Sequence, residues 1–243
     1  MRLISNIPHP TPAPPTGVSL LPRTLLGVEP DFFYRANGVA ADVSTWDAEF
    51  GSQLTLTGSG DSPSIVSSEL RDGSRGVQGA GAKYFVGPTD SIITTEHIVF
   101  EAVLKMPTAT GYMFAKYNSA DSGFGLYATT TTVVFNLHAT ALVQVGSPTI
   151  TAGSLVHIIG FMKRDGSGVI HANAVAGTPV DISEQSGSVD TTSVPLTALA
   201  RTGGAVFNGG AIYTLGLWTP TLTSHINPTI ASRRYALTGI GDL

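Results

Sequence analysis

The stretch from Ile150 to Trp218 constrains the fold of this chain more than any other part of the sequence. A β-rich arm runs up to Arg164, and the turn residues Asp165-Gly166-Ser167-Gly168 separate it from a second β-rich arm, Val169 to Val175. Two such runs joined by a glycine-bearing loop predict a β-hairpin. A Gly-Gly bend then precedes a further expected strand, Ala211 to Trp218. The stretch therefore predicts antiparallel sheet.

Candidate strands also recur before this hairpin, at a spacing of about ten residues, with Gly, Pro, Asp and Ser between them. Helical periodicity is missing there. Such a pattern is typical of an antiparallel sandwich or barrel. The expected strands are residues 32–34, 53–57, 83–86, 97–106, 111–117, 123–128, 132–138 and 142–146.

The strand from His97 to Met106 shows which face we expect to be buried. Side chains of a strand alternate between two faces. The even-numbered residues from Ile98 to Met106 are all apolar, whereas the odd-numbered set from His97 to Lys105 includes Glu101. We therefore expect the even-numbered face to lie in the core.

Residues 150–218 resemble the C-terminal half of the concanavalin A-like (laminin-G-like) jelly-roll family. The shared features are Ala152-Gly153 followed by His157, the hairpin, and a closing strand that ends in Leu217-Trp218. The resemblance extends from about residue 31 to residue 222 and is strongest in its last third. It implies an all-β fold, an antiparallel β-sandwich of the concanavalin A-like jelly-roll type, over residues 31–221.

Two departures from the family pattern affect what can be transferred. Leu155 or Val156 stands where the family has an aromatic residue, and Ala174-Val-Ala-Gly177 replaces its usual Tyr-Val-Asn-Gly. Lectin sites depend on aromatic platforms and convergent polar side chains. No sugar-binding residue is therefore carried over from the family.

Residues 1–30 form a predicted extended, proline-rich arm. They hold seven of the 15 prolines in the chain, which removes backbone donors and favours a polyproline-like path. The arm also carries four leucines that a solvated linker would not need. These leucines either pack on the chain's own sandwich or dock on a neighbouring subunit, and they are our interaction candidates: Leu20, Leu21, Leu25 and Leu26.

Residues 222–243 form a predicted short C-terminal helix and tail. Asn227-Pro228 supplies a capping residue followed by a proline suited to the first helical position. The expected helix, Thr229 to Leu237, carries Arg233 and Arg234. A pair of arginines on a short helix usually faces solvent, and we expect that here.

The charge balance excludes two classes of partner. Thirteen Lys and Arg against 17 Asp and Glu give a formal charge of −4. No basic field exists to hold nucleic acid or an anionic membrane. Cysteine is absent, so disulfides and thiolate metal sites are excluded. We also expect no signal peptide and no transmembrane segment, because prolines interrupt the start and the apolar run Leu155 to Met162 is too short to span a bilayer.

Catalytic motifs are missing from the sequence. Glycoside hydrolases of this fold place carboxylates in a Glu-x-Asp-x-x-Glu spacing on one strand, whereas the strand from His97 offers only Glu101. Asp181 and Glu184 lie in a polar loop where alternation would separate them. No Gly-x-Ser-x-Gly elbow occurs, and the glycine-rich segment Gly76 to Lys83 lacks the residues of a phosphate loop. The chain is therefore not expected to be an enzyme.

The metal candidates are equally sparse. With the even-numbered hairpin loop that the turn residues suggest, His171 would pair with Gly160 or Met162, on the face opposite to His157. An odd-numbered loop would put both histidines on one face but about four residues, roughly 13 Å, apart, so in neither case would they share a zinc ion. We expect His157 to be packed or hydrogen-bonded. The family resemblance leaves calcium open, although no clustering supports it, and we predict no cofactor. The loop residues that could bind calcium would be Asp61, Asp121, Asp165 and Asp190.

Three functions remain from the sequence. The first is a non-enzymatic virion structural protein, because the sandwich, the arm and the Ser/Thr/Gly-rich surface look like those of tailed-bacteriophage virion proteins. It would be a capsid decoration or a head or tail accessory subunit on the virion surface, and its arm would dock on other subunits or in a homo-oligomer. The second is a carbohydrate-binding module of a fibre or adhesin, which would bind host-surface glycan through exposed Tyr112, Tyr117 or Tyr127. The third, a glycan-cleaving enzyme, would need a pair of carboxylates in a cleft.

Overall fold

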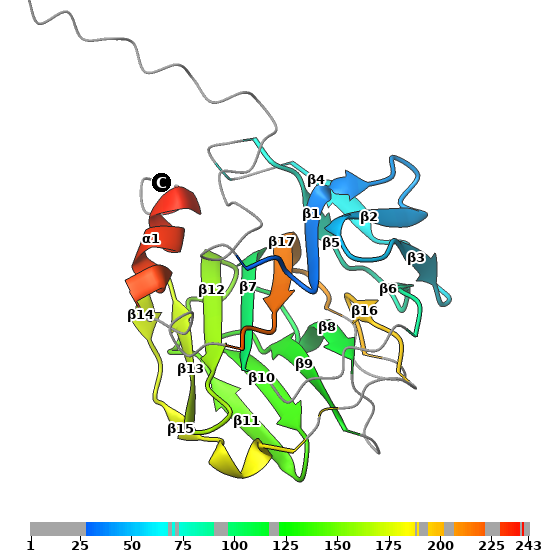
Figure 1. The fold of residues 1–243 in the computed structure, drawn as a ribbon. Helices are drawn as coiled ribbons and strands as arrows, with labels where there is room; N and C mark the ends of the chain where they lie inside the picture. The colour runs from blue at the N-terminus through cyan, green and yellow to red at the C-terminus, as the bar shows by residue number, and fades with distance from the viewer. Residues whose placement is uncertain are drawn as a thin grey trace, which may run out of the picture.

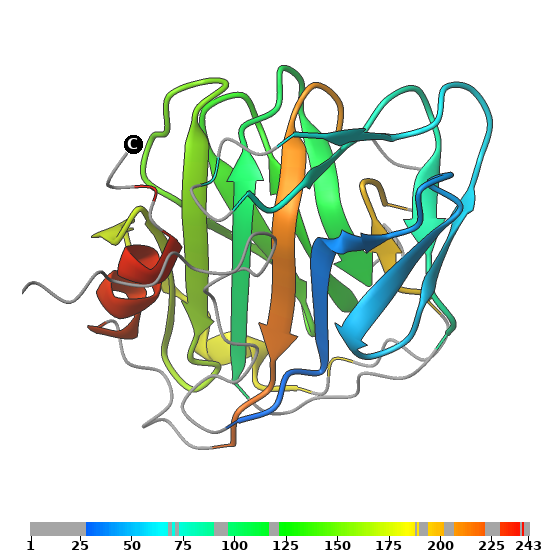
Figure 2. The same cartoon turned by 90° about the horizontal axis from the view of Figure 1, so that it is seen from above.

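The computed structural model of the chain describes residues 28–67, 70, 73–89, 97–116, 122–187, 189, 194–201, 207–221, 229–238 and 240. Over these residues the protein is an antiparallel β-sandwich with one α-helix, as the sequence predicts. Figures 1 and 2 show the two layers of strands from two directions.

The first sheet contains the long strands, and its neighbouring strands pair antiparallel. In spatial order these are β13 (Ser167–Ala172), β12 (Leu155–Met162), β7 (Ile98–Lys105), β17 (Ala211–Trp218), β1 (Phe32–Val39) and β2 (Thr45–Phe50). Four short strands extend this sheet. β14 (Val175–Ala176) and β15 (Val180–Asp181) pair with β13, β5 (Gly76–Gln78) pairs with β17, and β4 (Ser64–Val66) pairs with β5.

The second sheet faces the first. Its order is β16 (Thr197–Ala198), β8 (Gly111–Lys116), β9 (Gly123–Ala128), β10 (Val133–His138) and β11 (Leu142–Gly146). The strands β3 (Leu54–Thr57) and β6 (Tyr84–Val86) link β2 to β16 by hydrogen bonds, so one ribbon of paired strands runs through both layers. A 3₁₀ turn, η1 (Ser183–Gln185), follows β15.

The core lies between the two sheets. The rings of Phe100 on β7 and Phe135 on β10 stack with their centroids 4.6 Å apart and nearly parallel, which joins the layers directly. The even-numbered residues of β7 belong to this core, as expected. Gly160 on β12 leaves the space for the Phe100 ring, because a Cβ there would lie 2.1 Å from Cζ of Phe100.

The predicted hairpin is formed by β12 and β13, but our expected register is wrong. Lys163 N–H donates to Ser167 O, which leaves a loop of three residues, Arg164 to Gly166. An odd-numbered loop pairs His171 with Ile159 and not with Gly160 or Met162. His157 and His171 therefore lie on the same face of the sheet, two positions apart along the strands.

A second, tighter hairpin joins β13 to β14. Ala172 pairs with Val175, so its loop consists of Asn173 and Ala174. Both loop residues have positive φ, 48° and 66°, as a type I′ turn requires. Asparagine tolerates this conformation, whereas alanine is strained in it because Cβ approaches the following carbonyl.

Replacing Ala174 by glycine is expected to raise the free energy of unfolding by up to about 1 kcal/mol, since glycine adopts positive φ without that clash. The gain is reduced by the greater freedom of glycine in the unfolded chain. Urea unfolding of the two proteins checks this, with Ala176→Gly on β14 as the control that should destabilise. A loss of stability in Ala174→Gly would show that the turn does not strain Ala174.

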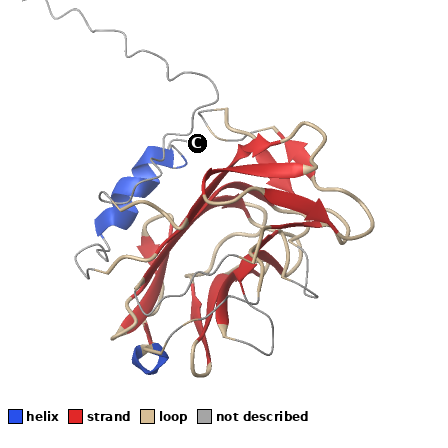
Figure 3. Cartoon of the chain, turned by 45° about the vertical axis from the view of Figure 1, so that its right-hand side comes forward, coloured by secondary structure: helices blue, strands red, loops and turns tan. Residues whose placement is uncertain are grey.

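The helix α1 (Thr229–Thr238) covers part of the outer face of the first sheet (Figure 3). It agrees with the helix predicted from Thr229 to Leu237. Ile230 and Ala231 are buried in a small apolar cluster with five sheet residues, Phe33, Val99, Ile159, Phe161 and Trp218. The expected solvent-facing pair of arginines is only half right, because Arg233 is exposed whereas Arg234 is buried.

Of the predicted arm, residues 1–30, the structure describes only residues 28–30. Val28 packs against the apolar cluster under α1, and Pro30 is buried. The four interaction candidates Leu20, Leu21, Leu25 and Leu26 lie outside the described residues, as does the expected cap at Asn227-Pro228. Within the described part of the chain, no helix is long and apolar enough to cross a membrane.

Candidate functional site

Two of the predicted tyrosines meet on the outer face of the second sheet. Tyr112 on β8 is directly opposite Tyr127 on β9, and their ring centroids are 5.4 Å apart. In the next row of the same face, Gly125 on β9 pairs with Asn136 on β10, which pairs with Gln144 on β11. Period-2 alternation therefore places two aromatic and two amide side chains on one surface.

A chain of hydrogen bonds joins these four side chains. Asn136 Nδ2 donates to Tyr112 Oη at 3.1 Å. Gln144 Nε2 lies within hydrogen-bonding distance of two acceptors, Asn136 Oδ1 at 3.0 Å and Tyr127 Oη at 3.3 Å. We call Tyr112, Tyr127, Asn136 and Gln144 the tyrosine–amide patch. Because each side chain fixes another, the patch is held in one arrangement.

The tyrosine rings lie across neighbouring strands. A Cβ on Gly125 would come within 3.3 Å of Tyr112 Cε1, so the absence of a side chain there lets the ring lie close to the sheet. Arg201, which follows β16, places its guanidinium carbon 5.3 Å from the centre of the Tyr112 ring. Tyr112 and Tyr127 are both half-buried, while Gln144 is exposed.

This arrangement has the features of a surface that binds polar ring compounds. Flat aromatic faces pack against the C–H faces of a ligand ring, and fixed hydroxyl and amide groups supply donors and acceptors at their edges. A preformed set of such groups loses little side-chain freedom when a ligand binds. The patch contains no carboxylate or histidine, and its four side chains can contact a ligand by stacking and by hydrogen bonding.

Sequence reasoning identified the aromatic half of the patch only. Tyr112 and Tyr127 are where the carbohydrate-binding hypothesis places them, and Tyr117 lies outside the described residues. Asn136 and Gln144 were missed. Their alternation with apolar Phe135, Leu137 and Val145 could have assigned them to the outer face, but only the register of β9, β10 and β11 brings them beside the tyrosines.

Glu101, the carboxylate that a hydrolase on this strand would need, is enclosed between β7, β12 and α1. Arg234 Nε donates to Glu101 Oε1 at 2.8 Å, and Arg234 Nη2 donates to Oε2. His157 Nε2 lies 2.7 Å from Glu101 Oε1, as expected for a hydrogen-bonded histidine. The ring of Tyr235 stacks on that of His157, and the Arg234 guanidinium lies over Trp218.

The pKa of Glu101 shows which interaction dominates. Burial alone would raise it, but the Arg234 charge and the hydrogen bonds from His157 and Arg234 lower the pKa from 4.5 to about 2. The carboxylate is 1% exposed and fully committed to Arg234 and His157. Glu101 therefore attaches α1 to the sheet and is not placed to act on a substrate.

The other acidic residues singled out from the sequence do not come together at one site. Asp181 Oδ1 accepts hydrogen bonds from the backbone and hydroxyl of Ser183, which form a local turn. Asp165 lies 3.7 Å from Lys163 on the surface. Among the described residues no group of three His, Asp or Glu side chains could hold a metal ion. Of the calcium candidates, Asp121 and Asp190 lie outside those residues.

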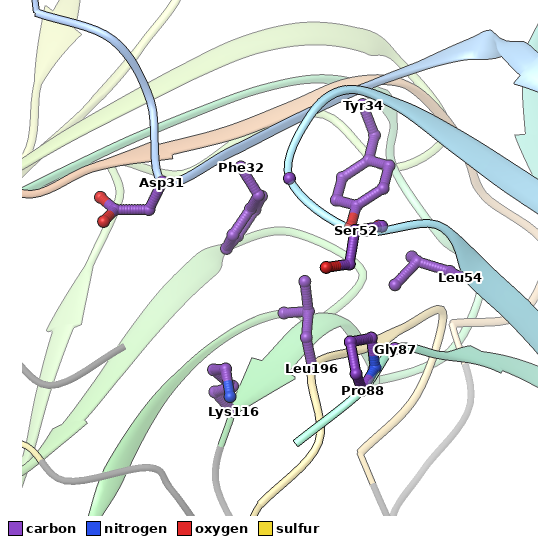
Figure 4. A pocket seen from close by; sticks show the side chains of 10 residues that line it. Asp31, Phe32, Tyr34, Ser52, Leu54, Gly87, Pro88, Lys116 and Leu196 are labelled. Carbon is purple, nitrogen blue, oxygen red and sulfur yellow. The ribbon is translucent and has the colours of Figure 1, made fainter. Parts of the chain in front are cut away.

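A small pocket opens where β1 begins (Figure 4). Its volume is about 70 Å³, and its walls include the buried side chains of Phe32, Leu54 and Lys116. Asp31 contributes to the rim, but its carboxylate points away from Phe32 and Lys116 in the figure. Burial raises the pKa of Asp31 against the opposing hydrogen bond from Thr219. The pocket is too small for a drug-sized ligand, since such sites measure about 300–1,000 Å³.

Several solved structures with a similar fold are binding domains of botulinum neurotoxins or of a mosquitocidal protein. The binding domain of Paraclostridial Mosquitocidal Protein 1 superposes with a TM-score of 0.64 at 10% identity, over 87% of this chain and 52% of that one. The serotype D botulinum neurotoxin binding domain superposes with a TM-score of 0.61 at 8% identity, over 87% of this chain and 52% of that one. For the serotype G binding domain the TM-score is 0.59 at 10% identity, over 86% of this chain and 51% of that one.

This chain spans about half the length of those binding domains. At such identities the likeness concerns the fold alone. No protein-family model matches the sequence, and no curated protein matches it significantly.

Proposed function

We propose that this protein is a non-enzymatic binding module that recognises carbohydrate on a cell surface through the tyrosine–amide patch. The observation that carries the proposal is the hydrogen-bonded set of two tyrosines and two amides on the outer face of β8 to β11. This is the second of the functions predicted from the sequence. The resemblance to the concanavalin A-like family, which includes lectins, supports it.

The comparisons add support of a general kind. The similar structures are described as binding domains and not as catalytic ones. One is a serotype D ligand binding domain in complex with N-acetylneuraminic acid. Another comes from botulinum neurotoxin type C, whose cell entry depends on interaction with two ganglioside molecules. A glycan-recognising function for a chain with this fold agrees with both.

A glycan array and two patch variants test the proposal. Saturable binding is expected for at least one glycan, and Tyr127→Ala should weaken it about tenfold, because an aromatic contact contributes up to about 1.5 kcal/mol. Gln144→Ala should weaken it as well, since Gln144 positions Tyr127. Tyr84→Ala, which removes a half-buried tyrosine from β6, is the matched control and should bind normally.

Two results would overturn the carbohydrate proposal. One is an array on which no glycan binds the folded protein. The other is a bound glycan whose affinity is the same in Tyr127→Ala, Gln144→Ala and the parent protein. The virion role and its arm-mediated docking are not favoured by any contact of the described residues and stay predictions of the sequence.

A further inference from the structure

A groove lies at one end of the sandwich, between the loop that joins β11 to β12 and the Asn173–Ala174 turn. Its volume is about 360 Å³, within the range of about 300–1,000 Å³ that small-molecule sites occupy. We call it the loop groove. It belongs neither to the tyrosine–amide patch nor to the pocket at β1, because it shares no lining residue with them.

The lining of the loop groove combines an apolar floor with a polar rim. Ile150, Val156 and Ala172 form buried parts of the floor. Thr151 on the rim is exposed, and so is Val175, at 62%. None of the lining residues carries a charge. A ligand that fits this groove therefore needs an apolar face and uncharged hydrogen-bonding groups.

Asn173 supplies a fixed donor to this site. Its Oδ1 accepts a hydrogen bond from the backbone N–H of His157 at 2.9 Å, which sets the side-chain orientation. The Nδ2 group makes no hydrogen bond to another described residue. The turn that presents Asn173 is also strained at Ala174, where φ is 66°. Strain of this kind is often retained where it positions a functional side chain.

The opposite rim is equally fixed. Both the backbone N–H and the hydroxyl of Ser154 donate to Thr151 O, at 3.2 Å and 2.7 Å. The backbone N–H of Ile150 donates to Thr131 O on the neighbouring turn. The loop is thereby held against the sandwich, and its hydroxyl oxygens remain able to accept hydrogen bonds.

We infer that the loop groove is a second binding site, for an uncharged, hydroxyl-rich ring such as a neutral hexose at the end of a glycan. The apolar floor packs against the C–H face of the ring, Asn173 donates to one hydroxyl, and the rim hydroxyls of Thr151 and Ser154 accept from others. The choice of a sugar rests on the proposed function, whereas the choice of an uncharged ligand rests on the lining alone.

Saturation-transfer NMR with the methyl glycosides of glucose, galactose and mannose tests this site. At least one of them should bind at millimolar concentration. In the Tyr127→Ala background, where the tyrosine–amide patch is weakened, Thr151→Tyr should abolish the signal, because it fills the groove from an exposed position. Asn173→Asp keeps the acceptor for His157 N–H and the tolerance of positive φ, but it lacks the Nδ2 donor. It should weaken binding at least tenfold.

Ser186→Tyr provides the matched control. Ser186 is exposed, and the carbonyls of its neighbours Gln185 and Gly187 accept hydrogen bonds from Arg164 in the loop at the opposite end of the β12–β13 hairpin. It should bind like the parent protein. Tyr127→Ala should also retain groove binding, because it alters only the patch. If none of the three glycosides binds, or if Thr151→Tyr binds as well as Ser186→Tyr in the Tyr127→Ala background, the groove is not a sugar site. Loss in Tyr127→Ala alone would leave the proposed function standing and overturn this inference.

Discussion

Replacing Arg234 by alanine is expected to lower the free energy of unfolding by about 3–5 kcal/mol. Arg234 is the cation that accompanies Glu101 beneath α1, and both side chains are almost fully buried. Without it, the carboxylate must either stay buried with His157 as its partner or regain water by detaching the helix. Each outcome costs free energy, because an ionised carboxylate is poorly stabilised away from water.

Arg233→Ala is the matched control for this variant. Arg233 is the preceding residue of the same helix and is exposed, so its removal should change stability by no more than about 0.5 kcal/mol. Arg234→Lys keeps the charge but cannot form the two-pronged contact with Glu101, and should fall between the two. Urea unfolding followed by tryptophan fluorescence suits the measurement, since the Arg234 guanidinium lies over Trp218. Equal stabilities of the Arg233 and Arg234 variants would contradict the role of the pair.

The pH dependence of stability distinguishes a contribution of the Glu101–Arg234 ion pair from one of packing alone. The pKa of Glu101 in the folded protein is about 2, below its ordinary value of 4.5. Its contribution to stability is therefore fully present above pH 4.5 and is lost as the pH falls through about 2. The stability difference between the parent protein and Arg234→Ala should accordingly shrink between neutral pH and about pH 2. A difference that is independent of pH would indicate packing alone.

The sequence predicts most of the long strands, because alternation and turn residues are local signals. It misses β2, β4 and β5, which the structure adds to the first sheet. It predicts the core face of β7 correctly from Ile98, Phe100 and their neighbours. It fails on the partners of Glu101 and Arg234, which are 133 residues apart and meet only when α1 docks. Helix position on a sheet depends on tertiary packing, for which a local pattern gives no measure.

The binding surfaces were predictable only in part for a related reason. The tyrosines of the patch could be proposed from residue type, since exposed aromatics are typical of sugar sites. Their amide partners depend on register, and a shift by one residue would move Asn136 to the core face. The hairpin between β12 and β13 shows the same limit, because one residue in the length of its loop decided which face carries His171.

The second large effect is expected at Gly160, where a single methyl group should destabilise the core by about 1–3 kcal/mol. An added Cβ would lie 2.1 Å from Cζ and 2.2 Å from Cε1 of Phe100. The ring cannot retreat easily, because it stacks on Phe135 of the opposite sheet at 4.6 Å. Gly160→Ala should therefore force Phe100 out of its place and loosen the contact between the two layers.

A double-mutant cycle separates this steric cause from the loss of glycine as such. Phe100→Ala alone should cost about 3–5 kcal/mol through the cavity that it leaves. In the double variant Gly160→Ala/Phe100→Ala the new methyl group meets no ring and partly fills that cavity. Its destabilisation should be at least about 1 kcal/mol smaller than the sum of the two single changes. Additive costs, measured by urea unfolding, would mean that the ring of Phe100 does not require glycine at position 160.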